Sequence, residues 1–479
     1  MRTTRRPLVL VAILASMFMS AMEATVVATV MPTVIAELRG IELYGWVSAA
    51  YLLATAASIP LWGRGADLFG RKPMLFAGMA LFLAASVACG LATSLPLLIA
   101  FRAVQGAGAG ALQPITLTLI GDLYSLEERS RIQGLFGGVW GFAAMVGPFV
   151  GGAITHVASW RWVFFLNVPF GVAAAALLVF FLHEPPRDTS RKVSLDLAGA
   201  GLLVTAVVSL LLGVGGTLTA LMLPLSLAAT VAFLACERRA DDPILPLSLF
   251  ESPVIAVASV ASTLMGAVMM TSLTYLPLYA QALLRASPTE AGAIVAPMLV
   301  GWPVSSVVSA RLVARIGARP LVRGGLVVVF ASTLLLRGAL AWGAAPLAMR
   351  AAMFVMGFGM GTCNTALILA VQDGVAWERR GIATASTVFF RTIGGTVAVG
   401  AFGALLSTRL EGRVPEAILR ALVGPEHGRG LAAAVLAGAS SDLRAAIATV
   451  FTGVVAIGLG VAASGVGFPR REAPPTARP

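Results

Sequence analysis

Stretches of about 20 apolar residues recur fourteen times along this chain, and short polar segments separate them. A helix of about 20 residues spans the hydrocarbon core of a lipid bilayer. Only 12% of the residues are charged, about half the share found in a soluble domain, so the chain cannot cover a globular surface with polar groups. The pattern predicts an all-α polytopic membrane protein with fourteen transmembrane helices, at residues 8–32, 44–63, 74–93, 96–120, 132–155, 161–183, 195–214, 218–236, 253–281, 289–312, 321–341, 346–371, 382–406 and 446–467.

The basic residues indicate how these spans are oriented. An even number of spans puts both termini on one side, and the termini together with the loops expected on that side carry 22 of the 34 lysine and arginine residues. Because cytoplasmic loops are enriched in these residues, we expect cytoplasmic termini and a location in the plasma or inner membrane. The same rule accounts for the net charge of +12 without a nucleic-acid partner. The first apolar run is too long for a signal peptide and contains Glu23, so it is predicted to be the first span.

An internal repeat relates the two halves of the chain. Six residues around the fourth span recur 251 positions later, in and after the twelfth: Gly106, Gly108, Gly110, Asp122, Glu127 and Arg129 match Gly357, Gly359, Gly361, Asp373, Glu378 and Arg380. At an offset of 247, Arg64, Gly70 and Pro73 match Arg311, Gly317 and Pro320. Since loop charges repeat as well as apolar residues, we expect two six-helix bundles related by pseudo-two-fold symmetry, with a substrate site between them. The predicted regions are 1–190 and 244–468 for the bundles, 191–243 for a two-helix insert, 407–445 for a long outer loop and 469–479 for a disordered cytoplasmic tail.

A polar motif follows the second span and predicts a cytoplasmic gate. Its glycines permit a tight turn, and Asp67 is placed to meet a helix N-terminus or an arginine. A basic loop that only sets topology is the alternative. The predicted gate residues are Gly63, Asp67, Gly70, Arg71 and Lys72, with Asp122 and Arg129 at and after the end of the fourth span.

Two further motifs lie inside spans. The fourth span contains Arg102, followed by Gly106 and Gly110, whose lack of a side chain permits close helix contact. In the fifth span Pro148 removes a backbone donor and kinks the helix, and Gly147 and Gly151 permit tight packing there. This second motif comprises Gly147, Pro148, Gly151 and Gly152. An ordinary kinked helix is the alternative interpretation.

These motifs resemble those of the major facilitator superfamily. The loop motif is similar to its cytoplasmic signature, and the fifth-span motif is similar to the signature of its antiporter branch. Residues 22–32 and 160–169 narrow the resemblance to the fourteen-helix drug:proton antiporters, the multidrug and quaternary-ammonium resistance exporters. The resemblance implies proton-coupled export of lipophilic cationic or neutral drugs by alternating access. Many members carry aspartate in the first span where this chain has Glu23, and the resemblance implies the same role for the glutamate.

Glu23 and Arg102 are the candidate proton-coupling pair. Charged side chains inside spans are rare and mark functional sites. Glu23 lies roughly 22 Å from the cytoplasmic end of its span and Arg102 roughly 9 Å from the outer end of the fourth, so in a core about 30 Å thick they reach similar depths. Burial disfavours the charged carboxylate and a nearby arginine favours it, so a group held between these effects can load and release a proton. A static buried salt bridge is the alternative.

The substrate is expected to be a monovalent lipophilic cation or a neutral amphiphile, because Glu23 is the only carboxylate predicted deep in the pore. Methionine and aromatic side chains adapt to varied shapes, and the candidates to line the path are Met19, Met22, Trp46, Tyr51, Phe142, Met145, Met269 and Tyr275. Arg391, the other charge inside a span, is predicted to be structural, and neutralisation of a helix C-terminus or contact with substrate are the alternatives. We expect a monomer with no cofactor, driven by the proton gradient, and no metal or disulfide, because the three cysteines lack the spacing of ligands.

Rival functions are distinguished by their motifs. The sequence contains no Gly-Lys-Ser/Thr loop, which excludes an ATP-driven pump. Its three histidines are scattered and no paired acids lie within a span, so an enzyme is not predicted. Two alternatives stay open: a proton-coupled exporter of one specific lipid or metabolite, and a non-transporting membrane sensor or scaffold with the same fold.

Overall fold

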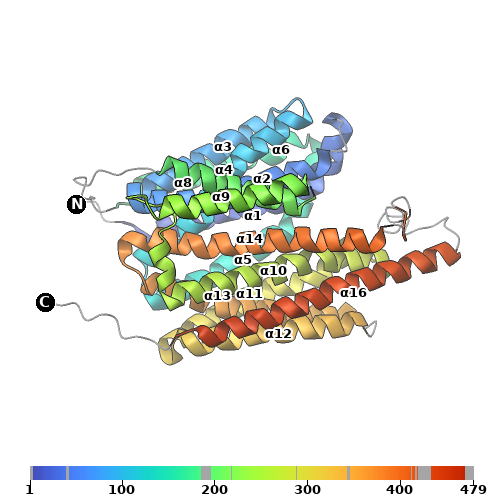
Figure 1. Cartoon of the computed structure of the whole chain (residues 1–479). Coiled ribbons are helices and arrows are strands. Elements are labelled where there is room, and N and C mark those ends of the chain that lie inside the picture. Colours follow the sequence, from blue (N-terminus) through green and yellow to red (C-terminus); the bar gives the residue numbers. More distant parts are fainter. Residues whose placement is uncertain are drawn as a thin grey trace. The chain divides into compact units, whose positions relative to one another are not determined.

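The computed structural model describes residues 4–38, 43–184, 196–216, 218–286, 288–341, 346–411, 413–415, 418 and 433–469. Within these residues the chain is helical and contains no strand (Figure 1). The α-helices are α1 (Arg6–Leu38), α2 (Tyr44–Phe69), α3 (Arg71–Gly90), α4 (Leu95–Leu123), α5 (Leu126–Val157), α6 (Arg161–Phe165), α7 (Asn167–Phe181), α8 (Leu197–Val214), α9 (Thr219–Glu237), α10 (Pro253–Leu283), α11 (Pro288–Ile316), α12 (Ala318–Ala341), α13 (Pro346–Asp373), α14 (Arg380–Leu410) and α16 (Ala433–Ser464). Short 3-10 helices are η2 (Leu247–Glu251), η3 (Trp377–Arg379) and η4 (Gly465–Gly467).

Each of the fourteen predicted spans coincides with a helix, or with the pair α6 and α7, in the described part of the chain. Thirteen described segments are long and apolar enough to cross a membrane, and α5, with 32 residues, occupies the remaining predicted span. The prediction of an all-α polytopic fold is therefore confirmed. The sixth span is divided between α6 and α7, and Pro169 explains the break because it lacks the N–H that would bond the carbonyl of Phe165.

Several helices run beyond the predicted spans. α16 begins at Ala433, although its predicted span begins at residue 446, and α14 continues to Leu410. The predicted outer loop at 407–445 is therefore helical at both ends, and its residues 419–432 lie outside the described part of the chain, as do residues 470–479 of the predicted tail. Hydropathy misses these helix ends because a helix that emerges from the hydrocarbon core can carry polar residues.

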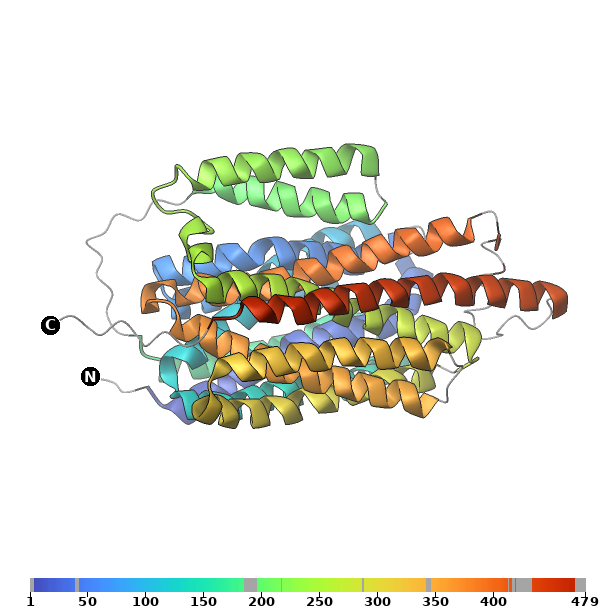
Figure 2. The same cartoon turned by 60° about the horizontal axis from the view of Figure 1, so that its bottom comes forward.

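The chain divides into two compact units. Unit 1 comprises Met1–Ser209, Pro224–Ser252 and Val371–Phe389, and unit 2 comprises Leu210–Leu223, Pro253–Ala370 and Phe390–Pro479. In unit 1, α1 packs on α5 and α7, and α4 packs on α2 and α3. In unit 2, α16 packs on α10 and α12. The green helices α8 and α9 lie side by side in Figure 2, and the Ser226 hydroxyl donates to the carbonyl of Ala206 (2.8 Å). The domain boundaries given by the sequence stay a prediction.

The internal repeat is visible in how the helices pack within each unit. In unit 1, Gly106 of α4 lies against the backbone of Tyr51 on α2, with no space for a side chain. In unit 2, the matching Gly357 of α13 lies in the same way against Met298 on α11, which follows Tyr51 by 247 positions. Gly108 with Phe82 and Gly359 with Val329 repeat this relation on α3 and α12. The sequence repeat is therefore also a repeat of helix contacts.

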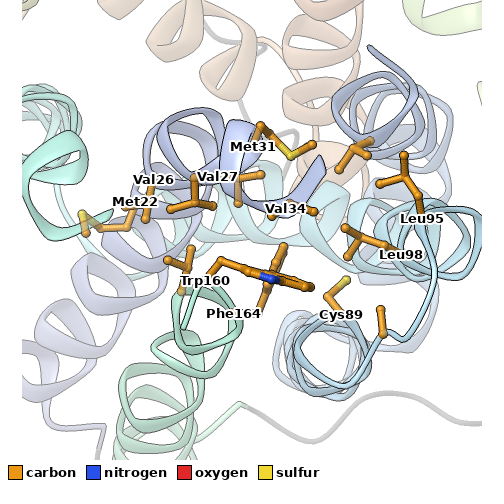
Figure 3. Close-up of a cluster of buried hydrophobic side chains, with 14 of the residues drawn as sticks. Met22, Val26, Val27, Met31, Val34, Cys89, Leu95, Leu98, Trp160 and Phe164 are labelled. Atoms are coloured by element: carbon orange, nitrogen blue, oxygen red, sulfur yellow. The ribbon is translucent and has the colours of Figure 1, made fainter. Parts of the chain in front are cut away.

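A buried apolar cluster fixes the position of α1 within unit 1. Figure 3 shows its side chains pointing toward one another from α1, α3, α4 and α6. Trp160 and Phe164 pack edge to face, with ring centroids 6.1 Å apart. The cluster includes Met22, the residue before Glu23, so apolar packing on these helices holds the backbone that carries the glutamate. The residues labelled in Figure 3 are Met22, Val26, Val27, Met31, Val34, Cys89, Leu95, Leu98, Trp160 and Phe164.

Candidate functional site

Glu23 and Arg102 form a buried ion pair within unit 1. Each residue is 2% exposed, and the Nη1 atom of Arg102 donates to Oε1 of Glu23. The second carboxylate oxygen, Oε2, accepts a hydrogen bond from the Nδ2 atom of Asn167 at 2.5 Å. Because a buried charge needs compensation, it is significant that both oxygens of this carboxylate have donors. The structure thus brings the two candidate proton-coupling residues together, while their role stays a prediction.

Three neutral polar side chains extend this pair into a network. Arg102 Nη1 also donates to Oε1 of Gln105 (2.7 Å), and Nε2 of Gln105 donates to the hydroxyl of Ser86 (2.7 Å). Asn167 Nδ2 is 3.3 Å from the same hydroxyl. We call Glu23, Ser86, Arg102, Gln105 and Asn167 the Glu23 cluster; it joins α1, α3, α4 and α7. Sequence reasoning missed three of its members, although Gln105 and Asn167 lie inside the motifs that carried the family resemblance.

Arg102 is held in place by more than the carboxylate. Its guanidinium carbon lies 4.1 Å from the centroid of the Tyr51 ring, a cation–π geometry. Its Nε atom donates to the carbonyl of Val47 at 3.3 Å. With Glu23 and Gln105 as further acceptors, this arginine is anchored to α1, α2 and α4, so a change at Glu23 leaves it with other partners.

Asp67 forms a second charged cluster, near the end of α2. Its carboxylate accepts hydrogen bonds from the backbone N–H groups of Gly381 (2.9 Å) and Ile382 (2.7 Å), in the first turn of α14. The free N–H groups at a helix N-terminus favour a negative charge. Asp67 also lies 3.2 Å from Arg71. The structure thus provides both partners that the sequence offered as options, a helix N-terminus and an arginine.

Arg71 extends the Asp67 cluster. Its Nε atom is 3.1 Å from Asp122, and its guanidinium stacks 4.1 Å from the ring centroid of Trp377 and donates to the carbonyl of that residue (2.7 Å). Asp122 also lies 3.5 Å from Arg380. The segment 373–382 is therefore fastened to α2, α3 and α4 by a chain of alternating charges.

Other predicted gate residues have different surroundings. Lys72 donates to the carbonyls of Val179 (3.0 Å) and Leu182 (2.5 Å), near the end of α7, so its ammonium is not part of the Asp67 cluster. Arg129 donates to the carbonyls of Gly121 and Tyr124 and lies 3.5 Å from Asp373.

The glycines of the gate motif serve its geometry. Gly63 of α2 lies against Ala385 and the carbonyl of Gly381, where a side chain would collide with α14. Gly70 has a φ angle of +109°, in the region that favours glycine. This turn exposes the first N–H groups of α3, at Arg71 and Lys72, to the carboxylate of Glu184 (2.7 and 3.2 Å).

The fifth-span motif is tightly packed at one position. Gly147 lies against Thr25 of α1, whose hydroxyl is 3.2 Å from the carbonyl of Ala143. Gly151 is buried, whereas an added side chain at Gly152 would meet open space. Close contact with α1 is thus seen at Gly147. The side chain of Pro148 lies outside the described part of the structure.

The residues predicted to line a substrate path occupy varied environments. Met19, Met22 and Tyr51 are buried. The ring of Tyr51 stacks with Arg102, and Met22 belongs to the apolar cluster. Phe142 is 52% exposed. Trp46 and Met269 are partly buried, and the buried Tyr275 donates its hydroxyl to the carbonyl of Val399 (2.7 Å). The side chain of Met145 lies outside the described residues.

Arg391 has a neutral partner in unit 2. Its Nη1 atom donates to Oδ1 of Asn364 at 2.9 Å, and its backbone lies against Gly266 of α10. The structural role of Arg391 stays a prediction.

A polytopic helical protein with repeated glycine packing and a buried carboxylate–arginine pair has the features of a membrane transporter. The chain belongs to the Major Facilitator Superfamily, whose model matches residues 13–399. It is a multi-pass membrane transporter of small substrates, not an enzyme.

Named relatives agree with this assignment. The chain is 33% identical over 417 residues to multidrug transporter protein MdtP of Bacillus subtilis (strain 168), covering 85% of this chain and 76% of the relative. It is 34% identical over 406 residues to multidrug resistance protein 3 of the same strain, covering 82% and 78%. The proton:xylose symporter XylE has a similar fold, with a TM-score of 0.64 at 15% identity over 95% of this chain and 94% of that chain.

Proposed function

We propose that this transporter is a proton-coupled antiporter, which exports monovalent lipophilic cations or neutral amphiphiles from the cytoplasm by alternating access. The observation that carries the proposal is the buried Glu23 carboxylate, held between Arg102 and Asn167 inside unit 1. Intramembrane ionisable residues mark proton and substrate pathways. The names of the relatives, multidrug transporter and multidrug resistance protein, support the substrate class.

The charge of the Glu23 cluster supports exchange rather than co-transport. With Glu23 ionised, its charge and that of Arg102 cancel; with Glu23 protonated, the cluster carries one positive charge. A cationic substrate nearby is repelled by the protonated cluster and tolerated by the neutral one. Proton and cation therefore exclude each other, which is the condition for antiport. A neutral substrate needs a different means of coupling, such as a protonation that changes the helix packing.

The Asp67 cluster supplies the gate in this proposal. We place it on the cytoplasmic side, together with both termini, in the plasma or inner membrane. Its contacts to the N-terminus of α14 keep the helix ends together, and they must separate when the cytoplasmic side opens. In this proposal the transporter acts as a monomer, and the proton gradient supplies the energy without a cofactor.

The substitution Glu23→Gln tests the proposal. Glutamine keeps the shape of the side chain but cannot load a proton, so we expect the variant to insert and to lose drug export driven by a pH gradient in proteoliposomes. Glu37→Gln is the matched control, because Glu37 lies on the same helix and is exposed; it should export normally. Continued uphill export by Glu23→Gln would refute proton carriage by this residue. A substrate panel that includes lipids and metabolites then tests the substrate class.

A further inference from the structure

Asn167 occupies an unusual position for a neutral polar residue. It is the first residue of α7, directly after the break that separates α6 from α7. It is only 4% exposed, in a segment otherwise rich in apolar residues. A buried amide is unfavourable unless its hydrogen bonds are made. Here those bonds are made, because the Nδ2 atom of Asn167 reaches Glu23 at 2.5 Å and Ser86 at 3.3 Å.

The hydrogen bonds to Glu23 depend on its ionisation. An ionised carboxylate accepts at both oxygens, whereas a protonated carboxyl has one oxygen that donates. Both oxygens of Glu23 face donors, Arg102 at Oε1 and Asn167 at Oε2. A proton arriving at Oε2 places O–H against N–H, so the bond to Asn167 is lost or rearranged.

Asn167 is the partner that yields when the proton arrives. Arg102 has other anchors, since it bonds Gln105 and Val47 and stacks on Tyr51. Among the residues that the structure describes, the Nδ2 atom of Asn167 has one other hydrogen-bond partner, the more distant Ser86 hydroxyl. The proton therefore favours Oε2 over Oε1, and the N–H···Oε2 bond between Asn167 of α7 and Glu23 of α1 is the one that is lost.

We propose that Asn167 is a positioning residue that donates its amide N–H to Glu23 only while the carboxylate is ionised, so that proton loading removes this hydrogen bond from the packed interface of α1 and α7. The inference rests on the proposed role of Glu23 as the proton carrier and deepens it, because it names the contact through which a proton changes the packing of unit 1. Such a change is what the export of a neutral substrate requires.

The groups around Glu23 leave few other sources of pH dependence. Within the described part of the chain, Arg102 on α4, Tyr51 on α2 and Cys89 on α3 are the ionisable groups that interact with it. The sequence of α7 contains no ionisable residue, and neither do residues 132–155 of α5. Arg161 on α6 is paired with Glu37. Arginine, tyrosine and thiol groups ordinarily titrate above neutral pH, and neither they nor the imidazole of His156 on α5 has the carbonyl stretch of a protonated carboxyl.

The test is an infrared pH titration of the full-length, reconstituted protein. The carbonyl stretch of the protonated carboxyl is assigned to Glu23 by its loss in Glu23→Gln. Asn167→Leu removes a donor from the ionised form, so we expect the midpoint of this band to rise by about one pH unit, the effect of one hydrogen bond to a charged group. Asn364→Leu is the matched control, since it removes a buried asparagine bonded to Arg391; its midpoint should equal that of the wild type.

Two outcomes overturn the inference: a midpoint in Asn167→Leu equal to the wild-type value, and the lack of any titrating Glu23 band in the wild type. Should Asn167→Leu fail to insert, Asn167→Asp tests the same contact, because a second carboxylate beside Glu23 disfavours the ionised form and raises the midpoint. The spectra do not depend on transport. If the midpoint rises but export ignores the pH gradient, the proposed antiport fails and the role of Asn167 stands.

Discussion

Replacing Asp67 by alanine should open the cluster that fastens the start of α14. The carboxylate has three partners, the N–H groups of Gly381 and Ile382 and the guanidinium of Arg71. Removing it leaves two helix N-terminal donors without their acceptor. Arg71 keeps Asp122 and the carbonyl of Trp377, so the arginine itself is not left uncompensated.

The magnitude follows from these partners. Leaving a buried donor unsatisfied costs about 1–3 kcal/mol, and breaking a buried pair by removing one partner costs about 3–5 kcal/mol when the other charge is left alone. Because Arg71 retains partners, we take the lower end, about 3 kcal/mol in total for Asp67→Ala. At about 1.4 kcal/mol for each factor of ten, the equilibrium for separating α14 from α2 should shift about 100-fold toward the open form.

Cysteine labelling measures this shift. Thr384, one turn into α14, is 1% exposed. In a chain with its native cysteines replaced, the labelling rate of Thr384→Cys by a maleimide reports the open population when opening and closing are fast. Asp67→Ala should raise that rate about 100-fold. Asp242→Ala, which breaks a buried ion pair with Arg64 of α2, should leave it unchanged. Equal labelling in Asp67→Ala and the parent would refute the gate.

Two further predictions concern packing and pH. Gly106→Ala and Gly357→Ala each press a methyl group against a neighbouring backbone, so each should destabilise the protein by about 1–3 kcal/mol in thermal melts. The control Gly138→Ala places its methyl group in open space and should leave the stability unchanged. Equal stability of all three variants would contradict the repeat of contacts. Hydrogen bonds from Arg161 and Trp160 lower the pKa of Glu37. These contacts of the ionised carboxylate therefore stabilise the fold fully at a pH above the ordinary glutamate pKa of about 4.3. The stabilisation is lost as the pH falls through the lowered pKa of Glu37. Arg161→Ala should raise the pH of this loss, followed by Trp160 fluorescence, and an unchanged midpoint would contradict it.

The contact of Glu23 with Arg102 could be predicted from the sequence because charges within spans are few. Two opposite charges at similar depth in apolar helices have each other as partners, since lipid offers none. Depth follows from counting residues along a span. The partners of Asp67 could be predicted for a related reason. An acidic residue among glycines near a helix end meets either a helix N-terminus or an arginine, and Asp67 meets both.

The neutral members of the Glu23 cluster could not be predicted in the same way. Ser86, Gln105 and Asn167 carry no charge, and polar residues of this kind occur on many faces of transmembrane helices. Placing them requires the rotation of each helix, which depends on tertiary packing rather than on counting. The position of the Lys72 ammonium could not be predicted from the sequence either. Lys72 is adjacent to Arg71 in sequence, but consecutive residues of a helix do not share a face, so its ammonium reaches the end of α7.

The two units share a packing framework and differ in their charges, which bears on the alternative of a static salt bridge. Position 353, which matches Arg102 at the offset of 251, holds a buried methionine, and Ala314 matches Asp67 at the offset of 247. Yet the glycine contacts of α13 in unit 2 reproduce those of α4 in unit 1. This helix packing therefore forms without the ion pair. Replacing a buried ion pair by apolar residues is often neutral or stabilising. A static structural role therefore does not by itself account for an ion pair in unit 1 where unit 2 has Met353 at the position that matches Arg102, and this favours the proposed proton carriage by Glu23.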